Sequence, residues 1–214
     1  MRACLREAIA EGIIHRDPTF GAVVKGKKDP KNEEVKYLDF EEVKKLTKVI
    51  MENLQPRYIS RYIILFALAT GARFSEILGL TWDCVNFEEK TVTINKTWDY
   101  HYKQTFDNTK NYASKRTITI DEHTLSILKD LKLKQTELAL KTGLRNEHNL
   151  VFVNSKFELV TNNAVNKTLR MLCKKAKIKE ITCHSLRHTH ASMLLYKGVN
   201  IKYVSRRLGH KDIV

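Results

Sequence analysis

Near the carboxyl end of the sequence, a histidine and an arginine three residues apart open an apolar helical pattern. His184 and Arg187 begin the stretch "HSLRHTHASMLLYKG", and their spacing places both side chains on one face of a helix. A guanidinium stabilises charge that develops on phosphate oxygens, and an imidazole carries protons near neutral pH. These are the residue types that a phosphoryl transfer requires. The alternative is a capped helix start with a solvent-facing arginine.

The same pattern offers a second kind of site. His188 follows His184 by four residues, a spacing at which two imidazoles on one helix face bind a metal ion. No cysteine or carboxylate stands at a spacing that would support such a site. We therefore expect no metal here and keep a zinc-dependent hydrolase only as an alternative.

Another arginine, Arg73, lies between apolar stretches in "FALATGARFSEILGL". An unpaired guanidinium is costly to bury, so Arg73 needs an anion. Glu76, three residues later, is a local partner on the same helix face. The functional partner would be a phosphate, whose oxygens match the planar fork of the guanidinium. From this stretch alone, the local ion pair is favoured.

Two lysines and a further histidine complete the candidates. Lys110 and Lys115 lie in "NTKNYASKRTITI", where a lysine on a loop between strands can reach a phosphate and act as a general acid. Each of them, taken singly, is alternatively a solvated loop lysine. His210 follows the glycine in "RRLGHKD", which is typical of a helix end. By itself it is a polar residue at that end.

The charge of the chain favours a polyanionic partner. Lys and Arg number 38 against 24 Asp and Glu, a net charge of +14 over 214 residues. Residues 131–214 alone hold 17 basic against 5 acidic residues, a net charge of +12. Binding of Lys and Arg to phosphates releases counterions and so favours association. DNA or RNA is therefore the expected partner, and a solvated basic surface is the alternative.

Other features of composition exclude whole classes of protein. No apolar run is long enough to span a bilayer, and the first residues lack the layout of a signal peptide. The four cysteines are scattered and form no CxxC pair, which is typical of reduced structural thiols. We expect a cytoplasmic protein with no membrane partner.

The elements that must hold these candidates follow from hydrophobic spacing. Alternation with β-branched residues predicts one antiparallel hairpin from 91–100 and 115–121, joined by a long polar connection, and a short strand at 150–154. Asp39 and Glu42 form a capping-box pattern, and Gly71 predicts a turn. The fold class is therefore mainly α with a small antiparallel β-sheet (α+β), with helices expected at 3–14, from Asp39 to 54, from 56 to Ala69, from Ser75, at 123–140, 162–178, 185–198 and 201–209.

Taken in order, three of these stretches resemble the successive motifs of the tyrosine recombinases, specifically the integrases of phages and conjugative elements. The stretches are "TGARFSEILGLTWDCVNF", "NTKNYASKRTITI" and "HSLRHTHASMLLYKGVNIKYVSRRLGHKDI". The resemblance covers residues 38–214 and implies the recombinase catalytic domain, lacking its carboxyl-terminal end. It further implies that residues 1–24 are the last helix of a core-binding domain and that the charged, aperiodic residues 25–37 are a linker.

The resemblance also assigns the residues. It implies a catalytic set of Arg73, Lys110, His184, Arg187 and His210, with Glu76 as a supporting neighbour. Lys110 matches the family's hairpin lysine because a threonine precedes it, and Lys115 is the second candidate for that position. We expect the DNA contacts to include Lys115, Arg116, Arg206 and Arg207.

The reaction implied is the integration or excision of a mobile element such as a phage or conjugative transposon. A tyrosine attacks a DNA phosphate, leaving a 3′-phosphotyrosyl link and a 5′-hydroxyl, and another 5′-hydroxyl reverses the step. Because the covalent link conserves the bond energy, no cofactor is implied. The implied partners are double-stranded attachment-site DNA and, for the full-length protein, its own copies in a homotetramer on DNA, in the nucleoid of a bacterial host.

The nucleophilic tyrosine is expected several residues beyond His210, and the sequence printed here reaches Val214. Tyr196 and Tyr203 precede His210 and have the wrong spacing, so we expect this segment itself to be inactive. Two DNA-acting alternatives stay open. One is a helix-turn-helix module built from residues 191–210, without catalysis, and the other is an enzyme like the type IB topoisomerases.

Overall fold

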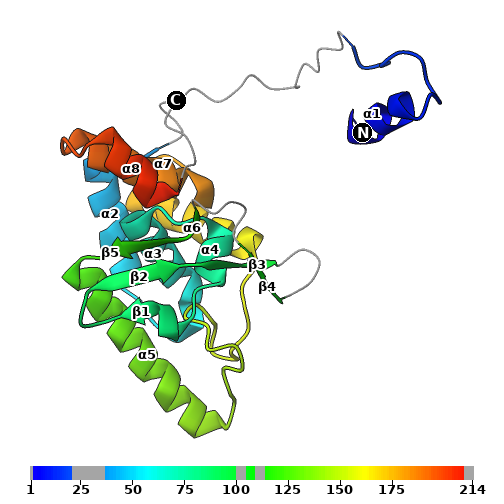
Figure 1. Cartoon of the computed structure of the whole chain (residues 1–214). Coiled ribbons are helices and arrows are strands. Elements are labelled where there is room, and N and C mark those ends of the chain that lie inside the picture. The colour runs from blue at the N-terminus through cyan, green and yellow to red at the C-terminus, as the bar shows by residue number, and fades with distance from the viewer. Residues whose placement is uncertain (1, 21–36, 100–104, 109–113, 210–214) are drawn as a thin grey trace. The chain divides into compact units, whose positions relative to one another are not determined.

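The computed structural model describes residues 2–20, 37–99, 105–108 and 114–209 (Figure 1). The chain divides into two compact units, Met1–Lys31 and Asn32–Val214. The smaller unit contains helix α1 (Arg2–Ala10), within the stretch that hydrophobic spacing predicts as helical. The division falls inside the predicted linker, and the assignment of the units to a core-binding domain and a catalytic domain stays a prediction. Among the described residues, no helix is long and apolar enough to cross a membrane.

Helices make up most of the larger unit, and α3 lies at its centre. This helix is buried along nearly its whole length, as expected for one that is apolar on all sides. It packs against α2, α4, α5, α6 and α7. The helices are α2 (Phe40–Met51), α3 (Ile59–Thr70), α4 (Phe74–Leu78), α5 (Glu122–Thr142), α6 (Asn162–Ala176), α7 (Cys183–Tyr196) and α8 (Ile201–Leu208), with 3₁₀ turns at Pro56–Tyr58 and Trp82–Cys84.

Local signals in the sequence account for the ends of these helices. The predicted capping box at α2 is confirmed, since the Glu42 N–H donates to Asp39 Oδ1 at 2.8 Å and the Asp39 N–H donates to Glu42 Oε2 at 2.9 Å. The side chains of Asp121 and Thr161 cap α5 and α6 by accepting from the N–H groups of Thr124 and Ala164. The predicted turn after α3 lies at Gly71, whose left-handed backbone closes the helix.

Two small antiparallel sheets replace the single predicted hairpin. The pairing of residues 91–94 with 116–119 is confirmed, and it places Val92 opposite Ile118 in the core. Residues 96–99, however, leave that sheet and pair with 105–108, a polar stretch that we assigned to the connection. The strands are β1 (Val85–Asn86), β2 (Thr91–Ile94) and β5 (Arg116–Thr119) in the order β1-β2-β5, and β3 (Lys96–Asp99) with β4 (Thr105–Asn108).

A contact between two aromatic side chains explains the second sheet, and the alternation of apolar and polar residues alone does not predict it. Trp98 of β3 and Phe106 of β4 are paired across the strands, and their ring centroids lie 5.0 Å apart in an edge-on arrangement. Cross-strand aromatic pairs of this kind stabilise a hairpin. One aromatic pair, of a buried Trp98 and a partly buried Phe106, therefore stabilises the pairing of β3 with β4, although the residues around Phe106 are polar.

The predicted strand at 150–154 is wrong. Leu150 makes a single bridge to Thr81, and residues 150–153 are almost fully buried. The Gln135 side-chain amide donates to the Val151 carbonyl at 2.9 Å, and the Val151 N–H donates to the Leu80 carbonyl at 2.9 Å. A side chain thus satisfies the Val151 carbonyl, and the backbone of residue 80 satisfies its N–H, without a paired strand.

Candidate active site

A tight turn between α3 and α4 brings Arg73 to the carboxyl end of α8. Gly71 has a φ of 66°, and a Cβ at this position would lie 2.6 Å from Leu208 Cδ2 and 2.9 Å from His190 Cδ2. Glycine therefore serves two purposes here, because it adopts the left-handed backbone and lets α7 and α8 approach the turn. Arg73 lies two residues later, at the start of α4.

Glu76 is the anion that the burial of Arg73 demands. Its side chain is only 1% exposed, and it accepts from Arg73 twice: from Nη1 on Oε1 and from the backbone N–H on Oε2, each at 2.8 Å. The predicted local ion pair is therefore present. The Arg73 side chain is nevertheless 36% exposed, so the pair leaves part of it accessible to a ligand.

Arg116 of β5 fills the remaining acceptor positions of the same carboxylate. Its Nη1 donates to Glu76 Oε1 at 3.1 Å and its Nη2 donates to Oε2 at 2.9 Å. Burial alone would raise the pKa of Glu76, but the hydrogen bonds and charges of Arg116, and then of Arg73, outweigh it and hold the pKa below its ordinary value. Glu76 is therefore a carboxylate at neutral pH.

Arg187 reaches the same place from α7. It is buried, with Nη1 donating to the Gly71 carbonyl at 2.8 Å and Nη2 donating to the Leu208 carbonyl at 2.6 Å. Burial, followed by the charges of Arg73 and Arg116, lowers the pKa of Arg187 to about 10. The guanidinium therefore stays protonated at neutral pH, and the structure brings the two predicted arginines together.

The last turn of α8 organises the cluster through three successive carbonyl groups, which we call the carbonyl turn (residues 207–209). The Arg207 carbonyl accepts from Arg116 Nε at 2.6 Å, the Leu208 carbonyl accepts from Arg187, and the Gly209 carbonyl accepts from Arg73 Nη2 over a long 3.5 Å. The carbonyl groups at a helix end lack helical partners and carry partial negative charge. They are therefore natural partners for three cations.

Two residues that anchor the carbonyl turn were not predicted in this role. His190 is buried; its Nδ1 lies 2.8 Å from the Leu68 carbonyl, and its Nε2 is 3.1 Å from the donating Nε of Arg207. A carbonyl only accepts, so this geometry requires a neutral imidazole with its proton on Nδ1. Burial, and then the charge of Arg207, lower the pKa of His190 to about 4. Arg207 also donates to the Thr119 and Ala69 carbonyls.

The sequence contained signals for two of the inward-facing residues, His190 and Arg116. His190 follows Arg187 by three residues and so shares its helix face. Arg116 has the same parity along β5 as the buried Ile118 and Ile120, which places it on the covered face of the strand. Lys115 has the opposite parity and is exposed.

The remaining predicted residues differ in what the structure says of them. His184 is exposed at the start of α7, with its ring centroid 5.0 Å from that of His188. Within the described ranges, no group of three or more His, Cys, Asp or Glu residues is arranged to hold a metal ion. Arg206 is exposed on α8. Lys110 and His210 lie outside the described residues.

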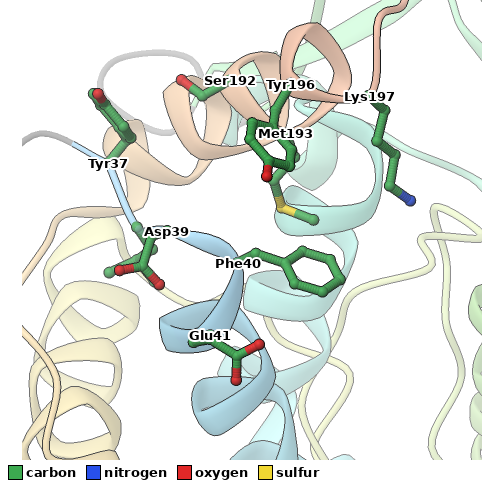
Figure 2. Close-up of a pocket in the computed structure, with 9 residues that line it drawn as sticks. Tyr37, Asp39, Phe40, Glu41, Ser192, Met193, Tyr196 and Lys197 are labelled. Carbon is green, nitrogen blue, oxygen red and sulfur yellow. The ribbon is translucent and has the colours of Figure 1, made fainter.

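A pocket of about 650 Å³ lies elsewhere, between the start of α2 and the later part of α7. Figure 2 shows Phe40, Met193 and Tyr196 facing the same space. Of the predicted site residues that the structure describes, none lines this pocket, so the arginine cluster is not part of it. The lining residues are Tyr37, Leu38, Asp39, Phe40, Glu41, Ser192, Met193, Tyr196 and Lys197.

Comparison with known proteins decides the family. The model of the phage integrase family matches residues 36–214. The chain belongs to the phage integrase family. It is 28% identical to the integrase of Staphylococcus phage L54a over 86% of the chain and 55% of that protein. It is 30% identical to a XerC-like tyrosine recombinase of Caldanaerobacter subterraneus over 96% of the chain and 56% of that protein. The chain thus spans about half the length of these curated relatives.

Solved integrase structures share the fold. The Tn1549 transposon integrase, in complex with transposon right end DNA, matches with a TM-score of 0.75 at 20% identity, covering 98% of this chain and 68% of that one. A lambda integrase dimer bound to a COC′ core site matches with a TM-score of 0.61 at 18% identity, covering 97% and 67%. The predicted resemblance and the mainly helical fold class are therefore confirmed. A helix-turn-helix module would account only for the last two helices, whereas this integrase match begins before α2.

Proposed function

We propose that the protein carrying this chain is a site-specific DNA recombinase that cleaves and rejoins strands through a 3′-phosphotyrosyl intermediate. One observation supports this most strongly: Arg73 and Arg187, 114 positions apart in the sequence, converge at the carbonyl turn. Three guanidinium groups and one carboxylate leave a net charge of +2 at this point. Such a cluster, open to solvent at Arg73, attracts a DNA phosphate.

The two arginines have distinct parts in this proposal. Arg187 is held rigidly by two carbonyl groups, and Arg73 is half-open to solvent, so a phosphate on the exposed side meets one fixed cation and one accessible cation. Donors fixed in advance stabilise the charge that spreads over the non-bridging oxygens in the transition state. Glu76 fixes the direction of Arg73 and takes no part in proton transfer, because all of its acceptor positions are occupied.

The proton transfers are assigned by family position. The tyrosine oxygen attacks phosphorus, the bond to the 5′-oxygen breaks, and Lys110 gives its proton to that oxygen. His184, exposed beside Arg187 on α7, takes the tyrosine proton, and His210 donates to a phosphate oxygen. Neither Tyr196, which lines the separate pocket, nor Tyr203 is proposed as the nucleophile.

The proposed partners are duplex attachment sites and further copies of the same protein. The related Tn1549 integrase is seen with transposon DNA, and lambda integrase is seen as a dimer on a core site. The exposed Lys115 and Arg206 are the DNA contacts that we retain. We propose a homotetramer on DNA for the full-length protein, acting in the cytoplasm of a bacterial host.

Covalent capture of DNA tests the proposal. The full-length protein is incubated with nicked duplexes tiled across the DNA that flanks its gene, and protein–DNA adducts are measured on denaturing gels. We expect adducts with the wild type and a loss of about 100-fold or more in R73A and R187A, the scale of removing a transition-state donor. Adducts at wild-type level in both variants would exclude the proposed site.

A second readout separates a recombinase from a topoisomerase. Two labelled duplexes that share the cleaved site are mixed with the protein, and joined products are measured beside the relaxation of a supercoiled plasmid. Joining of strands from different duplexes supports the recombinase. Relaxation without any joining assigns the protein to the type IB topoisomerase class instead.

A further inference from the structure

Arg116 does not lie where a DNA contact would lie. Its side chain is only 7% exposed. Four of its five N–H groups donate to protein acceptors: Nε to the Arg207 carbonyl, Nη1 to Glu76 and to the Ser114 carbonyl, and Nη2 to Glu76, at 2.6 to 3.1 Å. A phosphate contact requires N–H groups that are not already bonded within the protein, and Arg116 has one left, whereas Arg187, which is also buried, donates two bonds to carbonyl groups. The role of Arg116 therefore lies inside the protein.

We propose that Arg116 is a positioning residue for the DNA-cleaving site: it locks Glu76 to the carbonyl turn and thereby aligns Arg73 and Arg187. This inference rests on the proposed function. Arg116 contacts both halves of the site at once, since Glu76 holds Arg73 and the carbonyl next to that of Arg207 holds Arg187.

The first half of the argument concerns the charge of Arg73. Glu76 shares its two oxygens between Arg73 and Arg116, with one bond from each arginine side chain to Oε1. Without Arg116, the carboxylate would be free to turn and pair with both Nη atoms of Arg73, as carboxylates do with a lone guanidinium. That pair would be neutral and aimed away from a phosphate. The charge of Arg116 therefore leaves the charge of Arg73 available to the DNA.

The second half concerns the position of Arg187. The Arg207 carbonyl accepts from Arg116 Nε at 2.6 Å, and the next carbonyl along the chain accepts from Arg187 Nη2 at 2.6 Å. Any movement of the carbonyl turn would move Arg187 with it. A planar guanidinium makes the contacts to Glu76 and to the carbonyl turn from one rigid group, which a lysine ammonium does not.

The experiment compares R116K and R116M with the wild-type full-length protein. DNA affinity is measured at several salt concentrations, and the cleavage rate of bound DNA is measured in a single turnover. We expect both variants to cleave roughly 10- to 100-fold more slowly, the scale of a misplaced reacting group. In R116K, which keeps a positive charge beside Glu76, affinity and its salt dependence stay as in the wild type, because the charge of Arg73 stays available to the DNA. R170K, which alters an exposed ion pair to Glu180, is the matched control and leaves every value unchanged.

Two results would overturn the proposal. A phosphate contact at Arg116 predicts weaker binding and a salt slope lower by about one in R116M, with bound DNA cleaved at the wild-type rate in both variants. Wild-type behaviour in both variants shows that the residue is dispensable. A double-mutant cycle with E76Q adds a third criterion: effects that act through Glu76 are non-additive, whereas additive rate losses contradict the mechanism.

The positioning role is also measurable without cleavage, which separates it from the proposed function. If the wild type forms no adduct, the proposed function fails while the contacts of Arg116 stay testable by amide hydrogen exchange in DNA-free protein. We expect faster exchange at residues 205–209 in R116K, with α6 unchanged. Unchanged exchange at those residues overturns the positioning role. R116K keeps the charge and the buried stem, so it serves where R116M does not fold.

Discussion

Two arginines bind one carboxylate in this protein, and their surroundings give them opposite properties. Arg73, on the turn before α4, is 36% exposed, whereas Arg116, at the start of β5, is 7% exposed, and Glu76 between them is 1% exposed. The residue type and the partner are the same in both cases. Exposure, together with the number of N–H groups already bonded within the protein, separates an arginine that can receive a ligand from one that supports it, which is why charge in a sequence is a weak guide to DNA contacts.

The shared carboxylate carries the largest expected effect. Glu76→Ala leaves two guanidinium groups without their anion, one of them buried, and should lower the free energy of unfolding by about 3–5 kcal/mol. Urea denaturation measures the change. Glu122→Ala, which removes the exposed partner of Lys90, is the control and should leave stability almost unchanged. Equal changes in the free energy of unfolding in the two variants would mean that Glu76 does not stabilise the fold through its two arginines.

A second inward arginine extends the comparison to pH. His190, which accepts from Arg207, has its pKa lowered from 6.5 to about 4, so the unfolded chain takes up a proton first as the pH falls. The stability that the neutral imidazole confers is complete above pH 6.5 and is lost between pH 6.5 and about 4, on the order of 3 kcal/mol in total. Unfolding free energies of the wild type and H190Q, measured across this range, should converge as the pH falls. A constant difference would contradict the assignment of His190 as neutral in the folded protein.

The direct comparison of the two arginines is expected to show the smallest effects. Arg116→Met removes hydrogen bonds to a buried carboxylate and should cost about 2 kcal/mol, whereas Arg73→Met should cost less than about 1 kcal/mol because its side chain is half-open to water. Denaturation midpoints measure both. Reversed effects would assign the structural role to Arg73 and leave Arg116 available to DNA.

Several features of the fold were predictable because their causes are local. Asp39 and Glu42 lie within one turn of each other, and the capping box they form does not depend on the rest of the chain. The same holds for the turn at Gly71 and for the pairing of β2 with β5, whose alternation reports a half-buried sheet. The family motifs likewise led to Arg73 and Arg187, which the structure brings together.

Other features depended on contacts between distant segments. The β3–β4 pair rests on Trp98 and Phe106, and the buried backbone near Val151 rests on Gln135. The spacing of apolar residues within either segment does not identify these partners. The inward orientation of Arg116 could be predicted from the alternation of inward and outward side chains along its strand. Its positive charge, however, suggested a phosphate contact, and nothing nearby in the sequence identified Glu76 as its partner.

From the order of its residues, this chain specifies its helices, its main strand pairing and its membership of the integrase family, since each follows from spacing over a few residues or from motifs in sequence. The tertiary structure determines which arginine is available to a ligand and which one supports the site. Arg116 and Glu76 are separated by 40 positions, and Arg187 and the Gly71 carbonyl by 116. Burial and hydrogen-bond partners at such separations arise from packing, so they appear only when the distant segments meet.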